Sequence, residues 1–238
     1  MRLSIVMPVY NEGEVIGKTI KRVESLVNIP HELLIIYDMD EDTTIPQANK
    51  LQKKYPQVKL VKNIYGQGAL NALKTGLKFS KGDAACVMMA DLTDDPKVLN
   101  QMFAKFNQGY DVVAASRYMP GGHQIGGPLV KQILSRVAGI SLHFLVGLPT
   151  HDATNSFRLY SKKFLSKIKI ESDGGFELAI ELTVKAHFGG YKVTEVPTTW
   201  TYLNKESRFY LKKWLPKYLK WYLWAIKKRL YGFPQKAS

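Results

Sequence analysis

The feature that most constrains the fold is an alternation of short apolar runs with segments of helical spacing. Four such runs begin at Leu3, Leu33, Val58 and Ala84. A strand followed by a helix, repeated along a chain, predicts a mostly parallel sheet flanked by helices. We therefore expect an α/β fold with six or more strands. The expected helices span residues 14–27, 44–55, 68–79, 96–107 and 176–187, and two further strands span residues 112–116 and 192–197.

Polar residues that directly follow the strands indicate where a ligand binds. In parallel sheets, ligands bind at the carboxyl ends of the strands, where the loops gather. The residues at these ends are Pro8, Tyr10, Asn11 and Glu12, then Asp38, Asp40 and Asp42, then Asp91, Asp94 and Asp95. The loop from Asn63 to Asn71 precedes a helix, and Gly66 and Gly68 would let its backbone approach a ligand. A plain tight turn is the alternative for this loop.

The aspartates after the fourth strand predict a divalent metal site. Like charges repel unless a cation joins them, and Mg²⁺ or Mn²⁺ is commonly held by one or two carboxylates together with substrate phosphates. Asp91 with Asp94 offers such a pair, and the metal would neutralise a leaving diphosphate. The alternative is that Asp94 and Asp95 cap the helix that begins at Pro96.

The net charge of +14 is concentrated near the C-terminus. Residues 205–229 contain nine Lys and Arg residues and a single acidic residue, Glu206. Lys213, Lys217, Lys220 and Lys227 share one helical stripe, and Trp214, Trp221 and Trp224 accompany them. This pattern predicts two amphipathic helices, separated by Pro216, that lie on an anionic membrane surface. Packing on the protein's own core and contact with nucleic acid are the alternatives, and we expect no nucleic acid.

The remaining composition favours a peripheral, cytoplasmic protein. The apolar run at the N-terminus is too short for a signal peptide. The longest uncharged stretch, residues 137–151, is shorter than the ~20 residues that cross a bilayer, so we expect no transmembrane helix. Cys86 is the single cysteine, which excludes an intramolecular disulfide and a cysteine-based metal site.

Several motifs occur in an order that resembles the family-two inverting glycosyltransferases. They are IVMPVYNEGEVIGKTI, NIYGQGALNALKTGLKFSKGD, VMMADLTDDP, AASRYMPGG and FELAIELTVKAHFGGYKVTEVPTTW. The segments SRY, HDATNSFRLY and ESRF are similar to the dolichol-phosphate mannose synthase branch and its polyprenyl-phosphate relatives. The resemblance covers roughly residues 3–209. It implies a GT-A fold in residues 1–204, with a donor half at about 1–118 and an acceptor half at about 119–204, followed by membrane-surface helices in residues 205–238.

The resemblance also implies an activity and its residues. The expected reaction is inverting transfer of a hexose from a nucleotide diphosphate sugar, of the GDP-mannose or UDP-glucose type, to a polyprenyl or dolichyl phosphate, with Mg²⁺ or Mn²⁺. The implied donor-binding residues are Pro8, Tyr10, Asn11, Glu12, Asp38, Gly68, Asn71 and Asp91. Asp91 would also meet the metal. Arg117, Arg158, Ser207 and Arg208 are implied to contact phosphate, with a structural ion pair as the alternative for Arg117.

Two departures from the family pattern concern the donor and the metal. The paired aspartates after the second strand appear here as Tyr37 and Asp38, and the first Asp of the Asp-x-Asp motif appears as Met89. If the acceptor were a sugar or lipid-linked hydroxyl, Asp152 would be the candidate base, with a turn or helix-cap role as its alternative. A non-catalytic membrane or nucleic-acid binding protein with a degenerate transferase fold is the other alternative.

Overall fold

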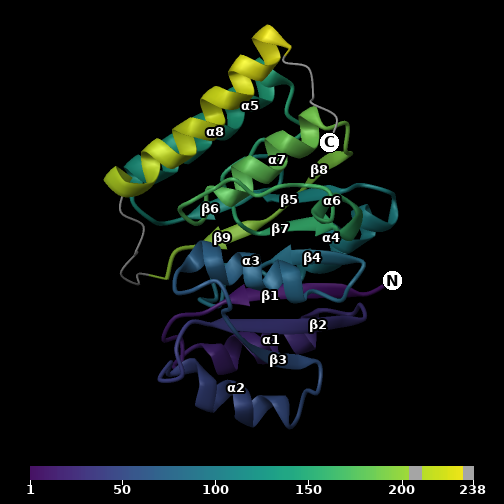
Figure 1. Cartoon of the computed structure of the whole chain (residues 1–238), viewed down its shortest axis with the longest axis vertical. Coiled ribbons are helices and arrows are strands. Elements are labelled where there is room, and N and C mark those ends of the chain that lie inside the picture. The colour runs from purple at the N-terminus through teal and green to yellow at the C-terminus, as the bar shows by residue number, and fades with distance from the viewer. Residues whose placement is uncertain (204–210, 233–238) are drawn as a thin grey trace.

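The computed structural model describes residues 1–203 and 211–232 and contains a seven-stranded mixed sheet (Figure 1). The strand order is β3-β2-β1-β4-β7-β5-β8, and only β7 runs antiparallel to its neighbours. Its strands are β1 (Leu3–Pro8), β2 (His31–Tyr37), β3 (Val58–Lys62), β4 (Ala84–Val87), β5 (Val112–Ser116), β7 (Arg158–Ser161) and β8 (Val193–Pro197). The prediction of a mostly parallel sheet with six or more strands is confirmed.

Five helices cover the two faces of this sheet. They are α1 (Ile16–Leu26), α2 (Thr44–Gln52), α3 (Ala69–Phe79), α4 (Val98–Asn107) and α7 (Leu178–Phe188), each close to a predicted helix. Apolar residues of α1, α2 and α4 join one core cluster, and those of α3 and α7 join clusters on the opposite face. Both faces of the sheet are therefore buried, as βαβ crossovers require.

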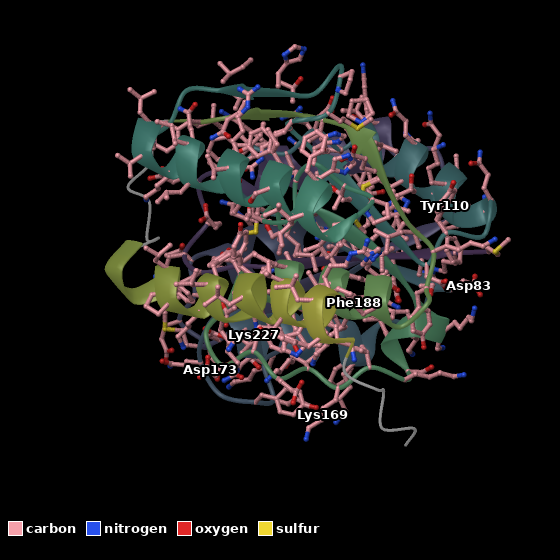
Figure 2. All side chains as sticks on the ribbon, turned by 90° about the horizontal axis from the view of Figure 1, so that it is seen from above. Asp83, Tyr110, Lys169, Asp173, Phe188 and Lys227 are labelled. Carbon is pink, nitrogen blue, oxygen red and sulfur yellow. The ribbon has the colours of Figure 1, made fainter. Side chains whose placement is uncertain are left out.

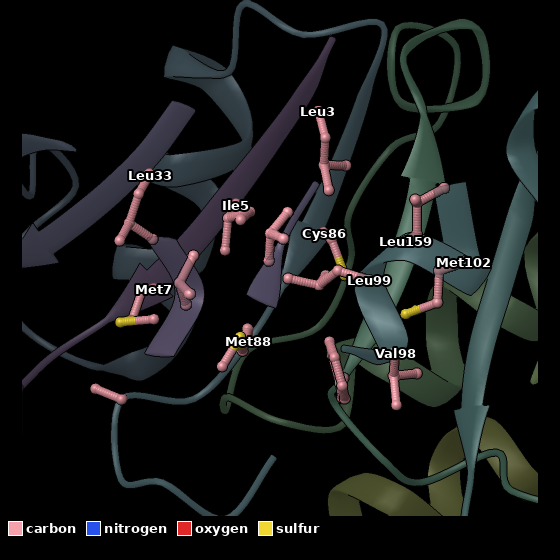
Figure 3. Packing of buried hydrophobic residues seen from close by; sticks show 14 of the residues in the cluster. Leu3, Ile5, Met7, Leu33, Cys86, Met88, Val98, Leu99, Met102 and Leu159 are labelled. Carbon is pink, nitrogen blue, oxygen red and sulfur yellow. The ribbon is translucent and has the colours of Figure 1, made fainter. Parts of the chain in front are cut away.

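Side-chain alternation along the strands supplies the main core (Figure 3). Leu3, Ile5 and Met7 of β1 point to the face covered by α1 and α4, where Cys86 of β4 also lies. Val6 points to the other face. Every residue of β1 is buried, and each large apolar side chain that is fully buried contributes about 1.5–3 kcal/mol. The sheet centre is therefore a rigid support for the loops at its edge.

A third layer lies on top of α7. It consists of α5 (Leu129–Val146) and α8 (Leu211–Tyr231), which lie side by side (Figures 1 and 2). Gly139 lets α5 lie directly on the backbone before Asp152, since an added Cβ would be 2.2 Å from the carbonyl oxygen of His151. A short helix, α6 (Lys162–Leu165), and a two-stranded sheet of β6 (His123–Ile125) and β9 (Thr199–Thr201) complete the described elements.

The prediction that Pro216 separates two helices is wrong, because α8 continues through it. Proline removes one backbone donor from a helix and costs about 3 kcal/mol in a helix interior. Trp221 and Ala225, one and two turns further along, are buried against α5 and α7. This packing stabilises the part of the helix that follows the proline.

Two of the tryptophans on α8 pack on the protein's own core, which was the alternative given for this segment. Trp221 is buried and its indole N–H donates to the Ser172 hydroxyl, and Trp224 packs edge-on against Phe188. Leucines face outward instead. The exposed leucines are Leu215, Leu219, Leu223 and Leu230.

The most apolar exposed surface belongs to α5, a helix that the sequence patterns did not predict. It is 18 residues long with a mean hydropathy of 1.4, and only 17% of it is buried, so by length and composition it is a candidate membrane helix. Length and composition alone do not show that the helix crosses a membrane, so the expectation of no transmembrane helix stays a prediction. Its exposed apolar residues are Leu129, Val130, Ile133, Leu134, Val137, Phe144 and Leu145.

Candidate active site

A cavity of about 1180 Å³ lies at the carboxyl ends of the central strands and reaches α5 and α8. Seven of the eight residues predicted to bind the donor line it: Pro8, Tyr10, Asn11, Glu12, Asp38, Gly68 and Asp91. The structure therefore brings together side chains from three separate strand ends. Asn71 is not in the wall. Its amide donates to the carbonyls of Tyr65 and Gln67, which supports the loop that carries Gly68.

The loop after β1 is held in shape by the segment before α2. Asn11 has a left-handed backbone, with φ of 56°, and its N–H donates to both carboxylate oxygens of Asp42 at 3.1 Å. Asp42 is buried and also accepts from the N–H of Thr44. Asp42 is thus a support for this loop and is not in the cavity wall.

Asp38 and the glycine loop form the next part of the wall. The carboxylate of Asp38 accepts from the side-chain amide of Asn63 and from the N–H of Gly68, both at 2.8 Å. Gly68 has φ of 121° and ψ of 150°, a conformation that is essentially restricted to glycine. The hydrogen bonds of Asp38 and the backbone conformation of Gly68 therefore hold this loop so that its backbone lies against the cavity at the start of α3.

Asp91 lines the cavity, and one of its carboxylate oxygens is held by Thr93. That oxygen, Oδ1, accepts from the N–H and the hydroxyl of Thr93 at 3.1 and 2.6 Å. Within the described residues, the other oxygen makes no hydrogen bond. Met89 also lines the cavity, so a thioether occupies the place of the family carboxylate. The sequence prediction of Asp91 at the wall thus has geometric support.

Asp94 is turned away from this cavity. Its side chain is buried, accepts from the N–H of Met89 at 3.1 Å and lines a second cavity behind the loop. Burial, and then the charge of Asp91, raise the pKa of Asp94 to about 7 from an ordinary value of 3.8. Among the described residues, no group of three His, Cys, Asp or Glu side chains could hold a metal by itself.

The raised pKa of Asp94 predicts a pH-dependent stability. A carboxyl whose pKa is higher in the folded state is destabilising once ionised, so this group lowers stability as pH rises from about 4 to about 7. Asp94→Asn keeps an acceptor for Met89 and removes the charge. In chelator at pH 8 we expect its melting temperature to exceed that of the wild type by about 5 °C. The gain should shrink at pH 5, and an equal gain at both pH values would contradict this account.

Arg117 reaches the cavity wall from the end of β5 and is gripped by Asp152. Its Nε and Nη2 donate to the two oxygens of Asp152 at 2.7 and 3.0 Å, and Nη2 also donates to the hydroxyl of Thr154 at 3.2 Å. Burial disfavours the charge on Arg117, but Asp152 outweighs it and raises the arginine pKa. Arg117 therefore stays positively charged.

Asp152, the candidate base for a hydroxyl acceptor, does not lie in the cavity wall. The residue is fully buried and its carboxylate is already engaged by Arg117. Burial alone raises the pKa of Asp152, but the charge and hydrogen bonds of Arg117 bring it below the ordinary value. A carboxylate that is inaccessible and hard to protonate does not take a proton from an acceptor.

Arg158, which the resemblance implies contacts a phosphate, does not lie in the cavity wall. This residue is fully buried in β7, outside the cavity wall, and burial lowers its pKa. Its guanidinium donates to the carbonyls of Asp152 and Ala179 at 2.5 and 3.0 Å and to the hydroxyl of Thr183. The motif did not reveal this burial. The other predicted phosphate ligands, Ser207 and Arg208, lie outside the described residues.

Sequence reasoning missed the far wall of the cavity. Lys131, Leu134, Ser135 and Ala138 line it from one face of α5, and their spacing is that of a helical stripe. Aromatic residues from β9, α8 and neighbouring segments complete it: Phe176, Trp200, Tyr202, Trp214 and Tyr218. Lys131 and Ser135 are four residues apart, the spacing of one helical face, and this spacing is the sequence signal that could have revealed the wall.

Comparisons with known proteins agree with this geometry. Residues 4–169 match the family described as Glycosyl transferase family 2. The chain is 28% identical over 204 residues to the dolichol-phosphate mannosyltransferase of Pyrococcus furiosus, covering 84% of this chain and 56% of that protein. It is 30% identical over 208 residues to the polyprenol monophosphomannose synthase of Mycolicibacterium smegmatis, covering 84% of this chain and 77% of that protein.

Solved structures show the same fold. Glucosyl-3-phosphoglycerate synthase from Mycobacterium tuberculosis, in complex with Mn²⁺, uridine diphosphate and glucosyl-3-phosphoglycerate, aligns with a TM-score of 0.67 and 17% identity. The alignment covers 99% of this chain and 81% of that one. The chain has the GT-A fold and belongs to glycosyl transferase family 2. It is therefore a glycosyltransferase.

Proposed function

We propose that the protein transfers a hexose from a nucleotide diphosphate sugar to a polyprenyl phosphate at a membrane surface. The observation that carries this proposal is the two-sided character of α5. One face of the helix lines the cavity with Lys131 and Ser135, and the opposite face exposes Ile133 and Val137 to solvent. A phosphate group and an apolar chain would thus both find complementary surface on one element. The relatives named for dolichol-phosphate and polyprenol substrates agree with this choice.

The charges along the cavity wall support a donor side and an acceptor side. Glu12, Asp38 and Asp91 lie at the ends of the first, second and fourth strands, and Arg117 and Lys131 lie toward α5. A nucleoside would be placed at the strand ends and its diphosphate near Asp91. The cationic residues suit an acceptor phosphate, since arginine and lysine are the usual partners of phosphate oxygens.

A phosphate acceptor also fits the absence of a base near α5. In residues 1–203 and 211–232, every carboxylate of the cavity wall lies on the donor side, and Asp152 is buried in its ion pair. A hydroxyl acceptor would need a group that removes its proton, whereas a phosphate is already ionised at neutral pH. The acceptor oxygen would displace the nucleoside diphosphate directly, with inversion at the anomeric carbon.

The residues present fit a divalent metal that is shared with the donor. Asp91 presents one carboxylate oxygen that makes no hydrogen bond with the described residues, and the protein offers no three-ligand cluster there. Mg²⁺ and Mn²⁺ are commonly bound by one or two carboxylates together with phosphates and water. When bound, the ion would neutralise the charge of the leaving diphosphate. With Met89 in place of a second carboxylate, we expect a modest apparent metal affinity.

The exposed surfaces of α5 and α8 favour peripheral association with the cytoplasmic face of a membrane. Both helices expose apolar side chains, and α8 also exposes the cationic Lys220, Lys227 and Arg229. Apolar insertion combined with attraction to anionic headgroups is the ordinary basis of interfacial binding. The helices also border the cavity, so the same contact would bring a lipid acceptor to it.

The test is nucleoside diphosphate release from a panel of nucleotide sugars, with Mg²⁺ or Mn²⁺ and anionic vesicles. Release that depends on polyprenyl phosphate is the expected result. Release only with sugar or lipid-linked hydroxyl acceptors would keep the transferase and reject the lipid-phosphate acceptor. Absence of both release and nucleotide binding would favour a non-catalytic protein.

A further inference from the structure

The buried Asp152 lies between two arginines and faces each with a different group. Its carboxylate accepts from Arg117 at the cavity wall, and its carbonyl accepts from Arg158 in the core. We propose that Asp152 is a positioning residue that fixes the Arg117 guanidinium in one orientation for contact with a phosphate oxygen of the substrates. This inference rests on the proposed phosphate-containing substrates and assigns Asp152 no proton transfer.

The geometry leaves Arg117 little freedom. The fork of Nε and Nη2 meets both oxygens of Asp152, and the Arg117 backbone N–H donates to the same carboxylate at 3.1 Å. The guanidinium also lies over the Tyr118 ring, with its carbon 4.9 Å from the ring centroid. Within the described residues, Nη1 makes no hydrogen bond, and it is the group left to bind a ligand. A planar fork held on one side presents its remaining N–H groups in a defined direction.

The turn that carries Asp152 is fixed as well. Oδ1 of Asp152 accepts from the N–H groups of Thr154 and Asn155 at 3.3 and 3.1 Å. Thr154 and Asn155 line the cavity, and the amide of Asn155 donates to the carbonyl of Ala115 at 2.9 Å. The carboxylate of Asp152 therefore accepts hydrogen bonds from the turn and from Arg117 at the same time.

Arg158 stabilises this turn from the core side. Its guanidinium joins the carbonyl of Asp152 to the carbonyl of Ala179 and the hydroxyl of Thr183, both on α7. Within the described residues it forms no ion pair with a carboxylate, so its hydrogen bonds serve to hold carbonyl groups. The turn is thus anchored to α7, and Arg117 is anchored to the turn. This preorganisation avoids reorientation of the arginine when charge develops on phosphate.

The test combines two substitutions in a cycle with transfer to polyprenyl phosphate as the readout. Arg117→Ala and Asp152→Asn are each expected to lower kcat about 100-fold with the donor KM changed less than about 3-fold. Because Asp152 acts through Arg117, the double variant should be no slower than Arg117→Ala by more than about 3-fold. If the fold-losses in kcat of the two single variants multiply in the double variant, the inference is overturned.

A matched control separates positioning from folding. Asp111 is another buried aspartate, which accepts from the Ser161 hydroxyl and the N–H of Lys192 away from the cavity. Asp111→Asn should lower stability yet leave kcat within about 3-fold for the folded protein. If Asp152→Asn does not fold, Arg117→Lys becomes the deciding variant. Lysine keeps the positive charge but lacks the planar pair of N–H donors, Nε and Nη2, that meets both oxygens of Asp152. Lysine at near wild-type kcat would overturn the inference, and a loss close to that of alanine would support it.

A second readout does not depend on catalysis. The Arg117 Nε–H signal in nitrogen-15 spectra, identified by its loss in Arg117→Lys, should be protected from exchange and should shift on addition of inorganic phosphate. In Asp152→Asn the protection and the phosphate response should be lost. The inference would be overturned if the wild-type signal does not shift on addition of phosphate, or if the variant responds to phosphate as the wild type does. Failure of the transfer assay alone would reject the proposed function and leave this result to decide the role of Asp152.

Discussion

An Asp91→Asn variant is expected to lose about 10³-fold in kcat with either Mg²⁺ or Mn²⁺ present. Asp91 is the carboxylate that β4 and its loop contribute to the cavity wall, and the neighbouring Met89 offers no charge. Asparagine keeps the shape and one oxygen that accepts from Thr93, so the loop should remain folded. Initial rates over a metal titration, with circular dichroism to confirm folding, measure the effect.

The matched control for this prediction is Asp95→Asn in the same loop. Asp95 accepts from the N–H of Lys97 at 3.1 Å and lies outside the main cavity. The Asp95→Asn variant should change kcat less than about 3-fold, since weakening one exposed hydrogen bond outside the cavity costs about 1 kcal/mol of stability or less. A tenth or more of wild-type kcat in Asp91→Asn, or an equal loss in both variants, would contradict the assignment of Asp91.

A second large effect is expected from charges on the outer face of α5. Ile133 and Val137 are each 59% exposed and one helical turn apart, so replacing both with aspartate should not disturb the core. Each apolar side chain that enters a membrane contributes about 1.5–3 kcal/mol, and the new charges repel anionic lipid. We therefore expect binding to anionic vesicles to weaken about 100-fold or more, measured by vesicle sedimentation.

The control places the same charges elsewhere. Gln101 and Ala104 are exposed on α4, on the opposite face of the sheet from α7. The Gln101→Asp and Ala104→Asp pair should bind vesicles within about 5-fold of the wild type, because only long-range repulsion changes. Equal losses in both pairs would mean that net charge alone governs binding, and unchanged binding of the α5 pair would reject α5 as the contact surface.

Sequence patterns predicted the part of the fold that is built from local repetition. The strands β1, β2 and β4 are mostly buried and rich in apolar residues, and β3 carries shorter apolar stretches between lysines; both patterns are readable without tertiary information. β7 was missed because its sequence, RLYS, contains an arginine that the fold buries completely. The helix α5 was missed because Gly139 and the segment around Gly147 interrupt its pattern, and the reason for Gly139 is a close approach to the chain before Asp152.

The residues of the site also fall into a group that sequence patterns could place and a group that they could not. Tyr10, Asp38 and Asp91 could be placed together because parallel strands end at one edge of the sheet. The α5 wall with Lys131 and Ser135 could not, since it is brought there by packing across long sequence separations. Asp152 and Arg158 were recognised as important residue types, but their roles depend on burial and partners. The spacing of residues in a motif shows neither how deeply a side chain is buried nor which groups it bonds.

The measurement that tests the central claim most directly is identification of the lipid product. The protein would be incubated with an isotopically labelled nucleotide sugar, Mg²⁺ or Mn²⁺, anionic vesicles and a polyprenyl phosphate, with Asp91→Asn as the negative control. The account predicts a labelled polyprenyl phosphohexose in the organic extract, formed by the wild type and nearly absent with the variant. Label that appears only on hydroxyl acceptors, or a lipid product that forms equally well with Asp91→Asn, would contradict it.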